Sequence, residues 1–321
     1  MIPWLEALPA WPSIALVALL LSRLMVLPGS RAPFNAFAII LQRLAKKVHP
    51  DITRSSFQQQ LSGTLALLLV VLLPLAITYG FYLLSELPLV LDAIILYFCL
   101  GSRLSLQQGT AVANSLQRQQ LTLAREQAAP LLLRDRGNLS AMGLSKACIE
   151  SLLQQQAANL VATLFWFLAG GGLLVLAYTL LQTAARQWNY KLPHYRYFGR
   201  TAARCYQLAL APGLIISTSL LAIQTGIRSA WRNYRQADTL FFYWPSRLLL
   251  AAGAAALGVK LGGPAYYAAL KTPRQRLGNG AEPTGKDILR VIMLINAQQT
   301  ALIILFSSML ALYIASILLM T

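Results

Sequence analysis

Acidic side chains, which could hold a metal ion or move a proton, are scarce in this sequence. The chain has ten Asp and Glu residues against 27 Lys and Arg in 321 residues, and a formal net charge of +17. Reactions that use Mg-ATP usually need carboxylates to hold the metal. The sequence also lacks a Walker A loop, a G-x-G-x-x-G turn, an H-E-x-x-H helix and a nucleophile elbow. Any enzymatic interpretation therefore depends on very few acids.

Histidines and cysteines give no metal-ligand pattern either. The two histidines, His49 and His194, lie far apart in the sequence, each in a basic loop beside a proline, and nothing supplies further ligands at a recognisable spacing. The three cysteines, Cys99, Cys148 and Cys205, are scattered, so we expect neither a disulfide framework nor a metal site. We expect buried structural thiols instead, because free cysteine is among the most buried residue types.

The elements that must position any site are apolar and long. Hydrophobic residues make up 57% of the chain and the mean hydropathy is +0.56. Leu61–Leu84 and Val291–Met320 are each long enough to cross a bilayer core as a helix. Further apolar runs are Ile14–Leu27, Leu89–Leu100, Leu160–Leu181, Leu208–Ile227 and Leu248–Leu261. We expect an all-α polytopic integral membrane protein with about five to seven membrane-embedded helical segments and a peripheral helical segment.

Two of these runs are interrupted by residues that disturb helices. Gly170–Gly172 lies in the middle of Leu160–Leu181, and Pro212-Gly213 lies inside Leu208–Ile227. Basic residues fill the loops on both sides of these runs, which breaks the positive-inside rule if every run crosses once. Each run could be a re-entrant helical hairpin, which is tolerated where its irregular backbone is buried in protein. The alternative is a pair of single kinked spans, and the sequence leaves both open.

Charge and polarity also suggest the domain organisation. The loop 28–60 has five Arg and Lys residues against the single acid Asp51, which is typical of a cytoplasmic loop. Residues 102–156 form the longest polar stretch, with helix-compatible runs at Ser105–Ala128 and Ser145–Gln156. We expect residues 1–321 to form one membrane domain, with 102–156 as a peripheral cytoplasmic insertion. Because no aromatic–basic module accompanies the positive charge, anionic lipid is favoured over nucleic acid.

The most specific sequence motifs lie near the C-terminus. They are LGVKLGGPAYY at Leu257–Tyr267 and RLGNGAEPTGKDILRVIMLI at Arg276–Ile295. Gly262-Gly263-Pro264 predicts a backbone turn at the end of an apolar helix, because Gly takes conformations that other residues avoid and Pro cannot continue a helix. Thr284 can cap a following helix whose first turn contains Asp287, a favourable place for a negative charge.

These motifs resemble those of the CbiB/CobD family of cobalamin biosynthesis membrane proteins, to which the AmpE proteins are distantly related. The resemblance continues upstream at Arg134-Asp135, Ile149-Glu150, Tyr190-Lys191 with Tyr195-Arg196, Ala203-Arg204 and Trp244-Pro245. It implies an integral membrane protein that acts late in corrinoid assembly. Members of this family join adenosylcobyric acid to aminopropanol or its phosphate in an ATP-dependent amide ligation.

The chain departs from this family mainly at acidic positions. Where the family has Asp or Glu, this chain has neutral residues at Leu27, Gln154, Ala158, Ala185 and Tyr206-Gln207. Family His and Asn positions are also changed, to Ala32, Gln155 and Gln182, and Thr239–Tyr243 has no counterpart of the family's H-S-S-P-N motif. Neutral side chains cannot balance the charge of Mg²⁺. The sequence therefore favours a catalytically impaired paralogue that binds a corrinoid or a partner. The alternatives are an active adenosylcobinamide-phosphate synthase and an AmpE-like regulatory or sensory membrane protein.

The resemblance also assigns candidate site residues. Glu150 and Asp135 are the catalytic candidates if activity survives, with ATP and Mg²⁺ as cofactors, and no metal ligand is assigned otherwise. Candidate substrate or anion-binding residues are Arg134, Lys191, Tyr195, Arg196, Arg204, Gly262, Gly263 and Pro264. The basic members among them could equally contact lipid headgroups. Expected partners are the lipid bilayer, a corrinoid intermediate, other cobalamin-assembly membrane proteins and a second copy of the chain, with no nucleic acid, in the bacterial inner membrane.

Overall fold

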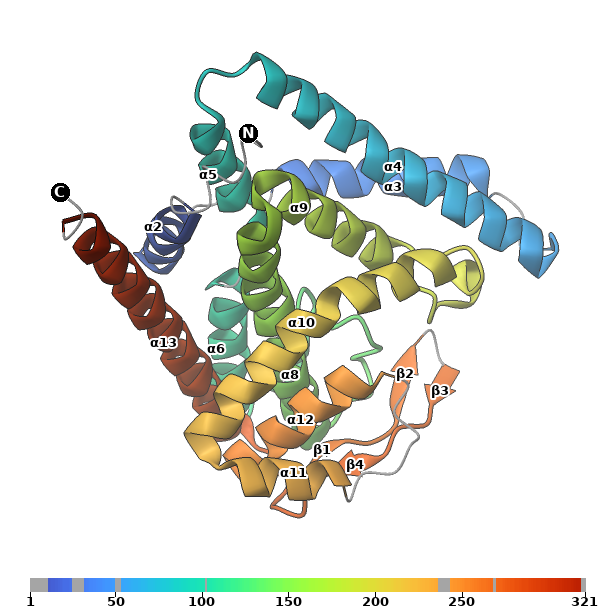
Figure 1. Cartoon of the computed structure of the whole chain (residues 1–321). Helices are drawn as coiled ribbons and strands as arrows, with labels where there is room; N and C mark the ends of the chain where they lie inside the picture. Colours follow the sequence, from blue (N-terminus) through green and yellow to red (C-terminus); the bar gives the residue numbers. More distant parts are fainter. Residues whose placement is uncertain are drawn as a thin grey trace. The chain divides into compact units, whose positions relative to one another are not determined.

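The computed structural model describes residues 11–24, 32–49, 53–101, 103–235, 243–267 and 270–318, and these are almost entirely helical (Figure 1). Five helical stretches are long and apolar enough to cross a membrane: Ser56–Leu84, Pro88–Gln117, Ala141–Gln187, Arg200–Thr225 and Gly285–Leu312, of which the second includes Ser102, outside the described residues. A shorter apolar helix covers Trp11–Leu21. The chain is thus an all-α multi-pass membrane protein, as its hydropathy predicts.

The described residues separate into two compact units, each assembled from distant parts of the sequence. Unit 1 takes residues from 1–101, 162–210 and 302–321, and unit 2 takes residues from 102–161 and 211–301. The single membrane domain with an insertion at 102–156 stays a prediction.

Unit 1 is a bundle of apolar helices. Its elements are α2 (Trp11–Leu24), α3 (Ala32–Val48), α4 (Ser56–Leu84), α5 (Pro88–Cys99), α9 (Ala162–Gln187), the short 3-10 helix Pro193–Tyr195, the first turns of α10 (Arg200–Thr225) and the end of α13 (Gly285–Leu318). Part of its core packs around Trp188 and Phe198, both fully buried. The Trp188 indole donates a hydrogen bond to the Leu41 carbonyl oxygen over 3.2 Å, which fixes α3 against the end of α9.

The glycine run in α9 breaks that helix at the predicted place. Gly170 and Gly171 have non-helical backbone angles, and Gly171 has a φ of 65°, which favours glycine. The buried Asp92 carboxylate of α5 accepts a hydrogen bond from Gly172 N at 2.7 Å and another from the Trp11 indole at 3.1 Å. A third donor is the Tyr82 hydroxyl. This carboxylate therefore satisfies the backbone N–H that the break exposes.

The second interrupted run is a single helix. Helix α10 continues from Arg200 to Thr225 with Pro212 inside it. A re-entrant hairpin at Pro212-Gly213 is therefore wrong, and the alternative of one span holds there. The physical reason is that a proline inside a helix removes one backbone hydrogen bond and bends the helix without necessarily ending it.

Unit 2 combines helices with two short antiparallel strand pairs. Its helices are α6 (Arg103–Gln117), α7 (Leu121–Gln127), α8 (Ala141–Gln156), a π-helix at Ala157–Val161, α11 (Ile227–Arg235), α12 (Trp244–Leu257), the remainder of α10 and the first turns of α13. Strand β1 (Leu261–Gly262) pairs with β4 (Arg276–Leu277), and β2 (Ala265–Tyr267) pairs with β3 (Leu270–Thr272). The strands are too short to show a period in the sequence, so they were not expected.

Two details differ from the sequence-based expectation. The apolar run Leu248–Leu261 is not helical to its end, because α12 stops at Leu257 and Gly258 takes a left-handed conformation with a φ of 66°. Of the three cysteines, Cys99 and Cys148 are buried as expected, whereas Cys205 is exposed. The expected burial of Cys205 is wrong because it lies on an exposed part of the first turns of α10.

Candidate functional site

The predicted glycine turn lies between β1 and β2 in unit 2. Gly262 and Gly263 have φ angles of 75° and 93°, a region that residues with a Cβ avoid. A Cβ on Gly262 would also overlap the Gln275 carbonyl oxygen, and the Gly263 amide donates to that same oxygen over 2.9 Å. The two glycines therefore let the turn fold tightly against the segment that leads into β4.

Glu150, on α8, is the buried carboxylate that holds this turn. Its Oε1 accepts a hydrogen bond from Gly262 N at 2.7 Å. Its Oε2 accepts one from Arg274 Nη2 at 3.1 Å and lies 3.8 Å from Arg134 Nη1. Both oxygens are thus engaged by donors from three separate segments, and one carboxylate ties α8, the glycine turn and two arginines together.

The two arginines beside Glu150 are largely buried, with 9% of the Arg134 side chain and 12% of the Arg274 side chain exposed. Arg274 also donates from Nε to the Gly263 carbonyl oxygen over 3.1 Å. Within the described part of the chain, Arg134 Nη2 is buried and has no hydrogen-bond partner. Because buried donors are nearly always satisfied, this nitrogen indicates a place where a ligand oxygen could bind.

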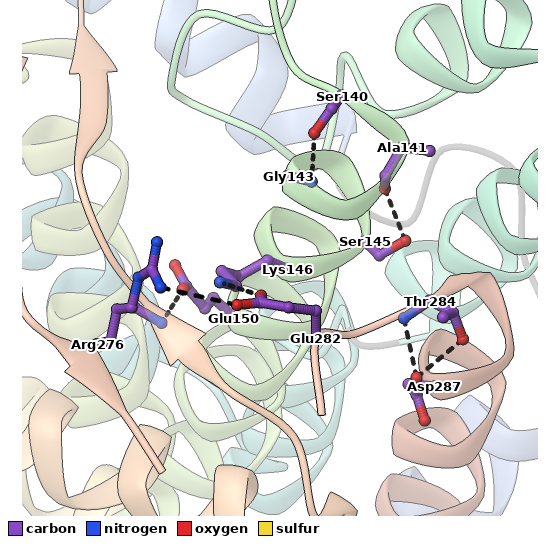
Figure 2. Close-up of polar contacts among 11 residues, drawn as sticks. Ser140, Ala141, Gly143, Ser145, Lys146, Glu150, Arg276, Glu282, Thr284 and Asp287 are labelled. Carbon is purple, nitrogen blue, oxygen red and sulfur yellow. Dashed lines mark hydrogen bonds and ion pairs between the residues drawn. The ribbon is translucent and has the colours of Figure 1, made fainter. Parts of the chain in front are cut away.

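A second ion-pair group lies next to the first (Figure 2). Lys146, one helical turn before Glu150 on α8, donates to Glu282 Oε2 over 3.0 Å, and Arg276 Nη1 lies 3.8 Å from Glu282 Oε1. The hydrogen bond from Lys146, helped by the charges of Lys146, Arg276 and Lys260, lowers the pKa of Glu282 below its usual value. The Glu282 carboxylate is therefore ionised near neutral pH. Glu150 and Glu282 are each held by two cations, so the two ion-pair groups together carry a net positive charge.

The start of α13 follows Glu282 directly and is capped by Thr284 and Asp287. Thr284 donates to Asp287 Oδ2 from both its backbone N and its Oγ1, each over 2.9 Å, and Arg290 Nη1 donates to Asp287 Oδ1 over 2.9 Å. Figure 2 shows Thr284 and Asp287 facing one another at this helix start. Thr284 directly precedes α13, as predicted, but the capping bonds run the other way, because the Asp287 carboxylate accepts from Thr284 and the Thr284 hydroxyl donates.

The structure brings part of the predicted site together. Arg134, Glu150, Gly262 and Gly263 make direct contacts with one another or with Arg274. Asp135 is exposed, and its backbone N donates to the Tyr266 carbonyl oxygen over 3.0 Å. The remaining member in unit 2, Pro264, is exposed.

The other four candidates belong to unit 1 and have different surroundings. Lys191, Arg196 and Arg204 are exposed, and Tyr195 packs against the His49, His194 and Phe198 rings. None of them belongs to the ion-pair groups of Glu150 and Glu282. All the site assignments, including the catalytic roles of Glu150 and Asp135, stay predictions.

Four members of the ion-pair groups were missed by sequence reasoning: Arg274, Arg276, Lys146 and Glu282. The spacing of Lys146 and Glu150 places both on one face of a helix, and this signal could have identified Lys146. Arg274 had no such signal, because it lies between β3 and β4 and comes close to Glu150 only through the pairing of these strands with β2 and β1, which the sequence does not reveal.

The donor set does not fit a resident magnesium ion. Magnesium is held by carboxylate oxygens, water and substrate phosphates in octahedral geometry. In the described ranges no three His, Cys, Asp or Glu side chains gather in a metal-binding group. The oxygens of Glu150 are already engaged by Gly262, Arg274 and Arg134. The arrangement is instead suited to binding an anion through guanidinium groups.

Comparisons with known proteins agree with the family that the motifs suggest. The family model described as CobD/Cbib protein matches residues 15–295. The "Cobalamin biosynthesis protein CobD" of Chromobacterium violaceum is 32% identical over 286 residues, covering 87% of this chain and 90% of that relative. The protein of the same description from Stutzerimonas stutzeri is 32% identical over 282 residues, covering 87% and 91%, and that of Klebsiella pneumoniae is 26% identical over 278 residues, covering 82% and 86%. No solved structure matches. This chain belongs to the CobD/CbiB family of cobalamin biosynthesis proteins.

Proposed function

We propose that this chain binds an anionic corrinoid intermediate in the late assembly or salvage of cobalamin, as a member of its family with weak or absent ligase activity. Its place would be the bacterial inner membrane. The observation that carries this proposal is the buried Nη2 of Arg134, a charged donor without a hydrogen-bond partner in the described residues, beside the cation of Arg274. An anion that reached this nitrogen would satisfy it.

The ligand group is a carboxylate. An amide ligation consumes a carboxylate, and the resemblance assigns that role to adenosylcobyric acid. Arginine pairs with a carboxylate through two parallel N–H groups, which makes it selective for this shape. Glu150 neutralises only one of the two neighbouring guanidinium charges, so the group keeps a net positive charge for the ligand.

The reduced ligase activity is supported by what occupies the positions of the family's acidic words. In unit 1, Ala185 and Tyr206 stand where the resemblance places Asp residues, and Gln182, at a family Asn position, donates from Nε2 to the Tyr206 hydroxyl over 3.2 Å. An amide paired with a phenol provides no charge for Mg²⁺. In unit 2, Glu150 is a positioning residue, because its oxygens hold the glycine turn and two arginines.

A ligation assay tests this proposal. Purified protein in detergent is supplied with adenosylcobyric acid, aminopropanol phosphate and Mg-ATP, beside the Chromobacterium violaceum relative as control. We expect corrinoid binding with turnover far below the control. Turnover near that of the control would overturn the impaired activity and favour an active adenosylcobinamide-phosphate synthase. Absence of both turnover and corrinoid binding would overturn the proposal and favour an AmpE-like regulatory role.

A further inference from the structure

One end of unit 1 gathers basic side chains from four separate segments. These are the end of α3, the residues before α4, the end of α9 with the following loop, and the start of α10. Figure 1 shows the end of α3 and the starts of α4 and α10 on the same side of this unit. The exposed members are Arg43, Lys46, Lys47, Arg54, Lys191, Arg196, Arg200 and Arg204, and Arg186 is half-buried. We call this set the basic end.

Specific contacts hold the four segments together, so the basic end is one surface. The Gln42 side chain of α3 donates a hydrogen bond from Nε2 to Gln187 Oε1 of α9 over 2.9 Å. The His49 ring, just after α3, lies 2.9 Å from the His194 carbonyl oxygen in the loop. Thr64 of α4 and Thr201 of α10 are joined by a hydroxyl–hydroxyl bond of 2.8 Å.

The charge of the basic end has one sign. The described residues of 32–49, 53–60 and 184–205 include no Asp or Glu, and Asp51 lies outside the described residues. Arg200 and Arg204 are one turn apart on α10, where like charges repel each other. By contrast, the sequence between Arg54 and Arg103 has no basic residue and contains Glu86 and Asp92. The charge is therefore strongly asymmetric along this unit.

The basic end stands at the height of lipid headgroups. It lies where the candidate spans Ser56–Leu84 and Arg200–Thr225 begin and where Ala141–Gln187 ends. Directly beside it, large apolar side chains are exposed: Phe57 is 74% exposed, Leu61 49% and Leu208 74%. Exposed apolar side chains on a membrane-spanning helix face lipid tails, so the cations next to them are level with the phosphates.

We propose that the basic end is a binding surface for anionic phospholipid, which holds this end of unit 1 at the cytoplasmic leaflet. Arg196, Arg200 and Arg204 donate to the phosphate oxygens, and the lysines of α3 add charge without fixed geometry. Under this proposal Lys191, Arg196 and Arg204 bind lipid, whereas Arg134 belongs to the proposed corrinoid site.

The test measures lipid binding to the whole purified chain after delipidation. Phosphatidylglycerol and phosphatidylcholine are titrated in detergent, and the bound lipids are counted by native mass spectrometry. Because each cation near an anionic surface contributes roughly fivefold in affinity, Arg200→Gln with Arg204→Gln should weaken phosphatidylglycerol binding by about 10- to 25-fold. The matched control is Arg118→Gln with Arg136→Gln, an equal change of charge at two exposed arginines of unit 2, which should change binding less than about twofold.

The result we expect is a preference of the native chain for phosphatidylglycerol that the first double variant loses and the control keeps. Equal binding of the two lipids to the native chain would overturn the proposal, as would unchanged binding by the first double variant. An excess of inorganic phosphate is added as a further arm. If free phosphate displaced phosphatidylglycerol, the surface would be a site for a soluble anion and the proposal would be wrong.

Discussion

The substitution Glu150→Gln tests the role of this carboxylate most sharply. Glutamine keeps an oxygen that can accept from Gly262 N but removes the charge shared by Arg134 and Arg274. The Glu150 side chain is 6% exposed and the two arginine side chains are 9% and 12% exposed, so water cannot reach the arginines well enough to take over the role of the lost negative charge. Breaking a buried pair and leaving its cations uncompensated costs about 3–5 kcal/mol.

The assay is unfolding of the purified chain in mixed micelles by increasing SDS, followed by circular dichroism. The matched control is Glu282→Gln, which breaks the ion pair with Lys146 but changes a side chain that is 35% exposed. The Lys146 side chain is only 10% exposed, but water reaches the Glu282 end of this pair, so its loss should cost less than the loss of a fully buried counter-ion. We therefore expect a large loss of stability for Glu150→Gln, which leaves two buried arginines uncompensated, and a clearly smaller one for Glu282→Gln.

A second variant keeps the reasoning testable if Glu150→Gln does not fold. Removing Arg274 as well, in the double variant Glu150→Gln with Arg274→Gln, leaves one fewer buried charge uncompensated and should restore part of the lost stability. Equal losses for Glu150→Gln and Glu282→Gln, or no recovery in the double variant, would refute the view that Glu150 is a buried counter-ion for the two arginines.

Three further predictions concern other contacts. Gly199→Ala should cost about 1–3 kcal/mol or more in the same SDS assay, because its Cβ would overlap the Trp188 carbonyl oxygen, whereas Gly80→Ala, with open space around it, should be close to neutral. Asp92→Asn should destabilise unit 1 by about 1–3 kcal/mol, because the new amide NH₂ would face the N–H and O–H donors of Trp11, Tyr82 or Gly172 without an acceptor. The control Glu86→Gln changes an exposed acid and should leave stability unchanged. Equal effects of the two substitutions would contradict this prediction. The pKa of Glu282 is lowered by Lys146, so its contribution to stability is present above the ordinary glutamate pKa of 4.5 and is lost as pH falls through the lower folded-state value. The difference in stability between the native chain and Glu282→Gln should therefore be constant from pH 6 to 8 and shrink below about pH 4.5, and a difference that grew with acid would contradict this sign.

The sequence was most informative where a local rule decides the structure. The uncharged run after Leu61 predicted a span that α4 provides, Gly170-Gly171 predicted a break in α9, and Thr284 with Asp287 predicted a helix cap. Each of these depends on the chemistry of residues close together in the chain. Pro212 was less informative, because a proline inside a long helix is compatible with both a kink and a hairpin.

The site was only partly predictable because its geometry depends on distant contacts. Family words identified Arg134, Glu150 and the two glycines, which the structure joins through hydrogen bonds and ion pairs. Arg274 completes the group from a segment more than a hundred residues away from Glu150, and no local pattern identifies it. The same resemblance grouped Arg134 with Lys191, Arg196 and Arg204, which the structure assigns to another unit, in the loop between α9 and α10 or in the first turns of α10.

The measurement that tests the central claim most directly is equilibrium binding of two corrinoids to the purified chain. Adenosylcobyric acid carries the free carboxylate, whereas in adenosylcobinamide this group is already an amide. A hydrogen bond between charged groups contributes about 1.5–3 kcal/mol, so the native chain should bind the acid roughly 10- to 100-fold more tightly. Arg134→Gln should abolish that preference, and Arg136→Gln, at an exposed arginine two residues further on, should keep it. Equal affinity of the native chain for the two corrinoids, or an undiminished preference in Arg134→Gln, would contradict an anion site at Arg134.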